Sequence, residues 1–121
     1  MKILIADDDR VWVELLGGAL QKRGIEVVTA FDGMQCMMAA MKTLPDAIVL
    51  DVQMPGGTGL DALKRLKMST KTAMIPVVVV SGVQDAAMPA TVRQLGAHSF
   101  VRKPTTPDDV VGVLGGFVAL P

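Results

Sequence analysis

The sequence predicts an α/β fold in which five parallel strands form a doubly wound sheet, in the order 2-1-3-4-5, with five helices. Short apolar and β-branched runs alternate with segments whose apolar residues recur at helical spacing. The run at residues 77–80 consists of valines alone, which is typical of a strand covered on both faces. With 121 residues and a hydrophobic fraction of 50%, we expect one domain spanning residues 1–121.

The first half of the chain predicts three strands and two helices. The first helix follows from Trp12, Leu16 and Leu20, which recur at helical spacing. Four methionines of the second helix share that spacing and predict its core-facing side. They are Met34, Met37, Met38 and Met41. The elements are a strand at residues 3–6, a helix at 9–23, a strand at 25–29, a helix capped by Asp32 and a strand at 47–50.

The second half predicts three helices and two strands. Thr58 is expected to cap the third helix after a loop at residues 54–57. Pro89 indicates that the fourth helix has an irregular first turn or a late start. The remaining elements are a strand at 77–80, a helix at 85–95, a strand at 98–102 and a helix from Pro107 to about Ala119.

Composition and charge exclude several functions. The 12 basic and 12 acidic residues are interspersed, so we expect no direct nucleic-acid or membrane binding. The amino terminus lacks the apolar region of a signal peptide, and no stretch is long enough to span a membrane, so a cytoplasmic location is expected. Cys36 is the only cysteine, which excludes an internal disulfide, and we expect its side chain to be buried.

Polar side chains follow four of the five predicted strands. Asp7 and Asp8 follow the first strand, Asp51 the third, Ser81 the fourth and Lys103 the fifth. The carboxyl ends of parallel strands share one edge, where open α/β sheets bind ligands. Crowded carboxylates repel one another unless a divalent cation binds them. The set therefore predicts a site for phosphoryl chemistry at that edge.

Asp51 is the predicted nucleophile of this site. It stands alone at the end of a central strand, beside a glycine-containing loop that can admit a phosphodonor, and its carboxylate would form an acyl phosphate. Asp7 and Asp8 are expected to hold Mg²⁺ together with Asp51, and the main-chain carbonyl of Gln53 is a further candidate ligand.

Ser81 and Lys103 are expected to contact phosphoryl oxygens, as a hydrogen-bond donor and as a compact cation. Each group also has a structural interpretation when taken alone. Asp9 in the acid run is typical of a helix cap, Ser81 before Gly82 of a turn, and Lys103 before Pro104 of a solvated loop. Only their occurrence together, at successive strand ends, favours the phosphoryl site.

These residues occur in an order and spacing that resemble the receiver domains of two-component response regulators. The matching positions are Asp7-Asp8, Asp51, the loop at 54–55 leading to residues 59–61, Ser81 and Lys103-Pro104. The resemblance covers essentially the whole chain and implies a flavodoxin-like fold. It implies that Asp51 accepts a phosphoryl group from the phosphohistidine of a sensor histidine kinase, from a phosphotransfer protein or from a small phosphodonor. Slow hydrolysis of the domain's own aspartyl phosphate is expected, without turnover of a metabolite.

The resemblance also implies the roles of individual residues. Asp8 would bind Mg²⁺ directly and Asp7 through water, and a cis peptide bond would precede Pro104. Phe100 stands at the position of the family's switch aromatic, whose ring turns inward as Ser81 moves onto the phosphoryl group. Many members carry tyrosine there, so any signal read through that hydroxyl is absent from this chain.

Three alternatives remain open from the sequence. A haloacid-dehalogenase-like phosphatase with Asp7 as nucleophile and Asp9 as its second acid fits the opening residues, although Asp108 and Asp109 open a helix rather than end a strand. A flavodoxin-like electron carrier fits the strand pattern but requires a hydroxyl-rich loop where this chain has acids. A receiver-like module that is not phosphorylated is the third, and the complete set of site residues argues against it.

The last predicted helix contains no charged residue after Asp109. Four of its apolar residues can face the sheet, namely Val110, Val113, Leu114 and Phe117. Val111, Val118 and Leu120 are then left outside. A helix that is apolar on all sides is usually covered on all sides. We therefore expect the face made by the fourth helix, fifth strand and fifth helix to contact a second copy, as a homodimer, or an adjacent output domain.

Overall fold

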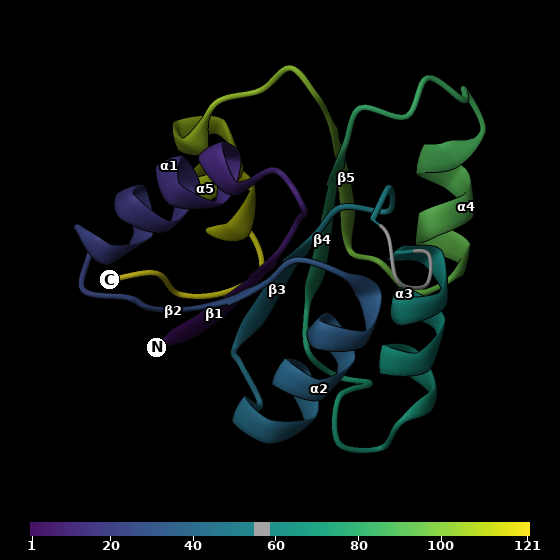
Figure 1. Cartoon of the computed structure of the whole chain (residues 1–121), viewed down its shortest axis with the longest axis horizontal. Helices are drawn as coiled ribbons and strands as arrows, with labels where there is room; N and C mark the ends of the chain where they lie inside the picture. The colour runs from purple at the N-terminus through teal and green to yellow at the C-terminus, as the bar shows by residue number, and fades with distance from the viewer. Residues whose placement is uncertain (55–58) are drawn as a thin grey trace.

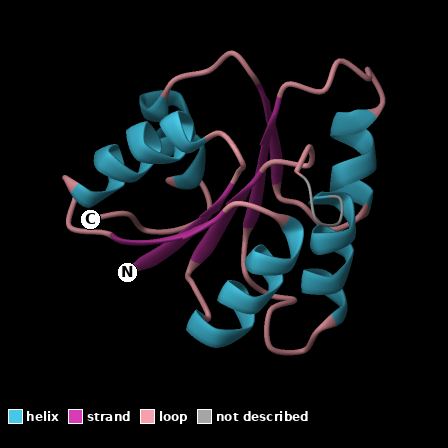
Figure 2. Ribbon diagram, viewed as in Figure 1, coloured by secondary structure: helices cyan, strands magenta, loops and turns pink. Residues whose placement is uncertain are grey.

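The computed structural model describes residues 1–54 and 59–121. Within these ranges, five parallel strands form one sheet in the order β2-β1-β3-β4-β5, which confirms the predicted fold class (Figures 1 and 2). The strands are β1 (Lys2–Ala6), β2 (Glu26–Ala30), β3 (Ala47–Leu50), β4 (Val77–Ser81) and β5 (Ser99–Arg102). The helices are α1 (Arg10–Gln21), α2 (Gly33–Thr43), α3 (Gly59–Met68), α4 (Met88–Gln94) and α5 (Pro107–Leu114).

Two helical layers cover the two faces of the sheet. Figure 1 shows α1 and α5 on one face and α2, α3 and α4 on the other. Successive strand residues point to opposite layers, so Ile3 and Ile5 pack with α1 and α5 while Leu4 packs with α2, α3 and α4. Every residue of β3 and β4 is buried. Polar groups that act on a ligand therefore have to lie at the strand ends.

Side-chain caps begin three of the helices. Asp9, Asp32 and Thr106 each accept a hydrogen bond from the backbone N–H three residues ahead, at 3.2, 2.7 and 3.1 Å. The predicted cap at Asp32 is confirmed, and α4 begins at Met88, later than residue 85, as Pro89 indicated. The expected cap at Thr58 and the glycines before it lie outside the described residues.

The predicted methionine face of α2 is wrong. Met34 and Met38 are 66% and 65% exposed, and only Met37 packs partly against the core. The buried residues of α2 are Gly33, Cys36 and Ala40. Helical spacing recurs on every face of a helix, so the pattern identified the helix correctly but could not choose between a methionine face and a face of small residues.

The carboxyl-terminal segment also differs from the prediction. The last helix ends at Leu114 rather than near residue 119. Val111, Val118 and Leu120 are not left outside, because each packs partly against the cluster under α1 and α5. Phe117, which was expected to face the sheet, is 40% exposed, and its ring lies edge-on to His98 with centroids 5.4 Å apart. Part of the apolar surface assigned to a partner is thus covered by the chain itself.

Two further expectations concern the lone cysteine and membrane-spanning helices. Cys36 is fully buried, as predicted, and burial, reinforced by the charge of Asp32, raises the pKa of its thiol to about 12. None of the helices in the described ranges is long and apolar enough to cross a membrane.

Candidate functional site

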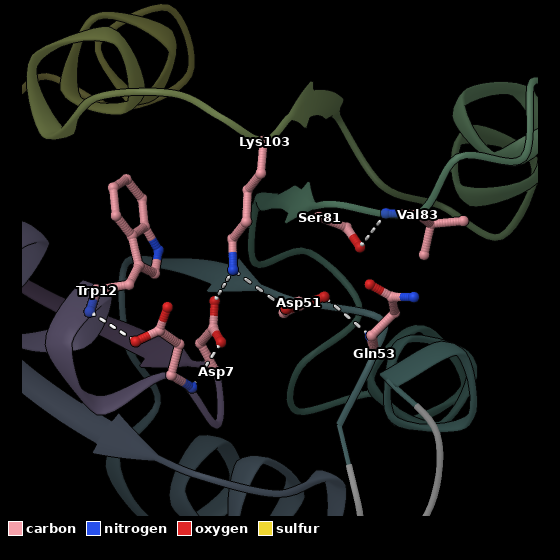
Figure 3. Close-up of polar contacts among 8 residues, drawn as sticks. Asp7, Trp12, Asp51, Gln53, Ser81, Val83 and Lys103 are labelled. Carbon is pink, nitrogen blue, oxygen red and sulfur yellow. Dashed lines mark hydrogen bonds and ion pairs between the residues drawn. The ribbon is translucent and has the colours of Figure 1, made fainter.

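Four strand ends bring their polar residues to one edge of the sheet. Asp7 and Asp8 follow β1, Asp51 follows β3, Ser81 ends β4 and Lys103 follows β5. The three carboxylates each place an oxygen within 4.8 Å of the others. In Figure 3 the Lys103 ammonium lies between Asp7 and Asp51. The structure therefore brings together the groups that the sequence placed at this edge.

Asp7 is held by hydrogen bonds to both of its carboxylate oxygens. Its side chain is nearly inaccessible, Oδ1 accepts from the Asp9 backbone N–H at 3.0 Å, and Oδ2 accepts from Lys103 Nζ at 2.8 Å. Burial raises the pKa of Asp7 above its usual value, with a smaller contribution from Asp51, while Lys103 and the Asp9 N–H act in the opposite direction. The charged carboxylate at this position therefore depends on its cation.

Asp51 is fixed by the chain on both sides of it. Oδ1 accepts from the Gln53 backbone N–H at 2.8 Å, and Oδ2 accepts from Lys103 Nζ at 3.3 Å. The first residue of α3, Gly59, packs directly on this strand end: a Cβ there would lie 2.3 Å from the Asp51 carbonyl oxygen and 2.4 Å from the Val52 Cα. Only glycine allows α3 to begin so close to the site.

Lys103 is the cation shared by the two buried acids. Burial alone would lower the pKa of its ammonium, but the hydrogen bond to Asp7 and the charges of Asp51 and Asp7 outweigh burial and raise it. The Lys103–Pro104 peptide bond is cis, as the resemblance implied. Lys103 Nζ also lies 5.9 Å from the centroid of the Trp12 ring, a residue predicted from its spacing only as core.

Ser81 is fully buried, and its Oγ accepts a hydrogen bond from the Val83 backbone N–H at 3.3 Å. The Val83 carbonyl accepts from Arg102 Nη1, and the guanidinium of Arg102 lies 5.2 Å from the centroid of the half-buried Phe100 ring. The sequence assigned no role to Arg102. Its place immediately before Lys103, at the end of the strand paired with β4, was the available signal.

Asp9 and Gln53 complete the immediate surroundings. Asp9 caps α1 through one of its carboxylate oxygens, which is the structural role expected for it and favours the receiver interpretation over the phosphatase. The Gln53 side chain is exposed and its backbone N–H is used by Asp51, while its carbonyl as a metal ligand stays a prediction.

The donor set at this edge suits a hard divalent cation. Carboxylate oxygens are the ligands that Mg²⁺ prefers, and Mg²⁺ keeps several waters when it binds proteins. Asp8 is exposed, whereas Asp7 and Asp51 are buried, so the cluster opens to solvent on one side. Three carboxylates and one ammonium leave the edge with excess negative charge, and a cation would relieve it.

Comparisons with known proteins agree on one family. The model of the response regulator receiver domain matches residues 3–114. Response regulator PleD of Caulobacter vibrioides is 37% identical over 110 residues, covering 91% of this chain and 24% of that protein. The alkaline phosphatase synthesis transcriptional regulatory protein PhoP of Bacillus subtilis is 33% identical over 109 residues, covering 90% of this chain and 45% of that protein.

The solved structures show the same architecture over almost the full chain. Chemotaxis response regulator CheY4 of Vibrio cholerae superposes with a TM-score of 0.89 at 27% identity, covering 97% of this chain and 98% of that chain. This chain spans less than half the length of PleD and of PhoP, at 24% and 45%. From the fold, the clustered strand-end residues and the match over residues 3–114, this chain belongs to the family of response regulator receiver domains.

Proposed function

We propose that this receiver domain is a phosphoacceptor switch. Asp51 takes a phosphoryl group from the phosphohistidine of a sensor histidine kinase or of a phosphotransfer protein, in a step that depends on Mg²⁺, and the modification shifts the domain between two conformations. One observation carries the proposal: Lys103 Nζ contacts the buried carboxylates of both Asp7 and Asp51. An ammonium that contacts both acids can stabilise the additional negative charge when a phosphoryl group forms on one of them.

In the proposed reaction the chain supplies the nucleophile and the stabilising donors. Asp51 Oδ2, the oxygen that faces Lys103, attacks phosphorus while the Gln53 N–H holds Oδ1. The new O–P bond forms as the P–N bond to the imidazole breaks, and the electron pair leaves with the imidazole nitrogen. Lys103 and the Ser81 hydroxyl then stabilise the phosphoryl oxygens. The raised pKa of Lys103 keeps its ammonium charged at neutral pH.

The metal part of the proposal assigns three carboxylates and one carbonyl. Asp8 would bind Mg²⁺ directly, Asp7 would act through water, and Asp51 and the Gln53 carbonyl would complete the protein ligands. When bound, Mg²⁺ would supply positive charge that neutralises the phosphoryl oxygens. This division of roles is supported by the two hydrogen bonds that the Asp7 oxygens already accept, and by the exposure of Asp8, which leaves room for the waters that Mg²⁺ retains.

The conformational part of the proposal involves Ser81, Phe100 and the α4-β5-α5 face. As Ser81 donates to the phosphoryl group, the Phe100 ring turns inward and the face changes shape for a second copy or an adjacent output domain. The exposed ring of Phe117 beside His98 supports a contact at this face. Slow hydrolysis of the aspartyl phosphate resets the switch, and the cytoplasmic location stays a prediction.

Intact-mass measurement after incubation with acetyl phosphate and Mg²⁺ tests the reaction. The parent chain is expected to gain one phosphoryl group, Asp51→Asn none, and the control Glu14→Gln, an exposed acid of α1, the same gain as the parent. Omitting Mg²⁺ should remove the gain. A parent that stays unmodified with acetyl phosphate and with phosphoramidate contradicts the proposal and favours a receiver-like module that is not phosphorylated.

A further inference from the structure

The segment between β4 and α4 is held through both backbone polar groups of one residue, Val83. Its N–H donates to Ser81 Oγ at 3.3 Å, as Figure 3 shows, and its C=O accepts from Arg102 Nη1. Ser81 and Arg102 are themselves partners in the register of β4 and β5. Val83 is therefore tied to the ends of two adjacent strands, 2 and 19 residues away in sequence.

Arg102 contacts a second group that belongs to the proposed switch. Its guanidinium carbon lies 5.2 Å from the centroid of the Phe100 ring, within the range of a cation–π contact. The side chains of Phe100 and Val83 both pack partly against the cluster under α2, α3 and α4. One exposed guanidinium thus covers the segment's carbonyl and the aromatic ring together.

The two hydrogen bonds to Val83 differ in strength. The bond to Ser81 joins neutral groups and is slightly longer than the usual range for an N–H donor. The bond from Arg102 has a charged donor, and such bonds are the stronger kind. The position of the segment therefore depends on Arg102 as well as on Ser81, and losing either bond loosens the segment.

We propose that Arg102 is a positioning residue that holds residues 82–84 in their resting place and thereby slows phosphorylation of Asp51. This inference rests on the proposed function, in which Ser81 leaves Val83 for the phosphoryl group and Phe100 turns inward. The first movement removes the hydrogen bond between Ser81 and Val83, and the second moves the Phe100 ring away from Arg102. Residues 82–84 can shift with Ser81 only when the guanidinium releases the Val83 carbonyl. Removing the guanidinium destabilises the resting arrangement relative to the modified one.

Two measurements on Arg102→Met test the inference, because methionine keeps a long apolar side chain and removes only the charged donor. The first is amide hydrogen exchange of residues 82–87 without phosphodonor or Mg²⁺, and the second is the rate of mass gain with acetyl phosphate and Mg²⁺. We expect faster exchange and a rate increase of about threefold or more, for the loss of one exposed charged bond. Arg93→Met, an exposed arginine of α4, should match the parent in both.

The outcomes separate this inference from the function on which it rests. Unchanged exchange in Arg102→Met overturns it, because the segment is then held by other contacts. Faster exchange with an unchanged or lower phosphorylation rate also overturns it, since Arg102 would then assist Ser81 rather than restrain it. If the parent takes up no phosphoryl group but Arg102→Met exchanges faster, the restraint of the segment is supported and the proposed function fails.

Discussion

Two partly buried lysines at opposite ends of the sheet differ in the charge of their partners. Lys103, at the carboxyl ends of the strands, donates to the carboxylates of Asp7 and Asp51 at 2.8 and 3.3 Å. Lys67 of α3, near the start of β4, donates to two backbone carbonyls within residues 73–75 at 3.0 and 2.7 Å. Burial lowers the pKa of Lys67, whereas the acid partners raise the pKa of Lys103 against burial.

The difference shows how one kind of side chain serves structure at one end of the fold and chemistry at the other. Two neutral carbonyls accept hydrogen bonds from the Lys67 ammonium and tie the segment before β4 to α3, without a cluster of acids from the described residues beside it. Around Lys103 three carboxylates face one ammonium, so the balance of charge changes whenever a cation or a phosphoryl group arrives. Reactivity is expected where several charged groups crowd together, and rigidity where one ammonium is held by neutral carbonyls.

The largest expected effect comes from a methyl group added at each end. At the carboxyl end, Gly59→Ala forces backbone against backbone, since the Cβ would lie 2.3 Å from the Asp51 carbonyl oxygen, and we expect the free energy of unfolding to fall by about 3 kcal/mol. At the amino end, a Cβ on Gly96 would meet the flexible Lys67 side chain at 2.8 Å, with a φ of +105°, so Gly96→Ala should cost about 1–2 kcal/mol. Urea denaturation measures both variants, and equal losses would contradict the distinction.

The same contrast explains which parts of the fold and of the site could be predicted from the sequence. Asp51 and Lys103 were identified because parallel strands share an edge, so a place at a strand end is enough to bring two residues together. Arg102 was missed, because its contact depends on the path of a segment 19 residues earlier and on its own side-chain rotamer, which no spacing rule encodes. Met38 was assigned to the core for a related reason, since periodicity defines a helix but not which of its faces lies on the sheet.

The second effect compares removal of the two ammonium groups. Lys103→Met leaves two buried carboxylates without their cation and should cost about 2–3 kcal/mol at pH 7 without Mg²⁺. Lys67→Met leaves two neutral carbonyls without a donor and should cost about 1–2 kcal/mol. Thermal or urea unfolding of both variants beside the parent gives the two losses.

The pH dependence of these losses is the sharper readout. Burial already raises the pKa of Asp7 above 3.8, and without Lys103 it rises further. An acid whose pKa is higher in the folded than in the unfolded state makes ionisation costly for the fold. Below about pH 3.8 the acid is protonated in both states and does not lower the free energy of unfolding. The loss of stability grows as the pH rises from there through the pKa of the folded state. The loss in Lys103→Met should therefore shrink between pH 7 and pH 4. The loss in Lys67→Met should also change below about pH 6.5, but only through His98, whose pKa is lowered by burial and by the Lys67 charge; in a His98→Gln background it should stay constant while the loss in Lys103→Met still shrinks. A loss in Lys103→Met that is the same at pH 7 and pH 4 would refute the charge argument.

The smallest expected effect is a gain in stability from removing the proposed nucleophile. In Asp51→Asn the amide oxygen can still accept from the Gln53 N–H and Lys103 keeps Asp7 at 2.8 Å, so the bond lost is the longer one from Lys103, at 3.3 Å, which the amide NH2 cannot accept. The edge changes from three carboxylates facing one ammonium to two, and relief of like-charge repulsion should raise the free energy of unfolding by about 1 kcal/mol without Mg²⁺.

Added Mg²⁺ should reverse that order. The ion stabilises whichever folded state binds it, by about 1.4 kcal/mol at a concentration tenfold above its dissociation constant, and the parent, with one more carboxylate, binds it more tightly. Melting temperatures of the parent, Asp51→Asn and Glu14→Gln with and without Mg²⁺ measure both signs at once. A lower melting temperature for Asp51→Asn in the absence of Mg²⁺ would mean that the Lys103–Asp51 contact at 3.3 Å outweighs the repulsion among the acids, so that the crowded carboxylates do not destabilise the carboxyl end of the sheet.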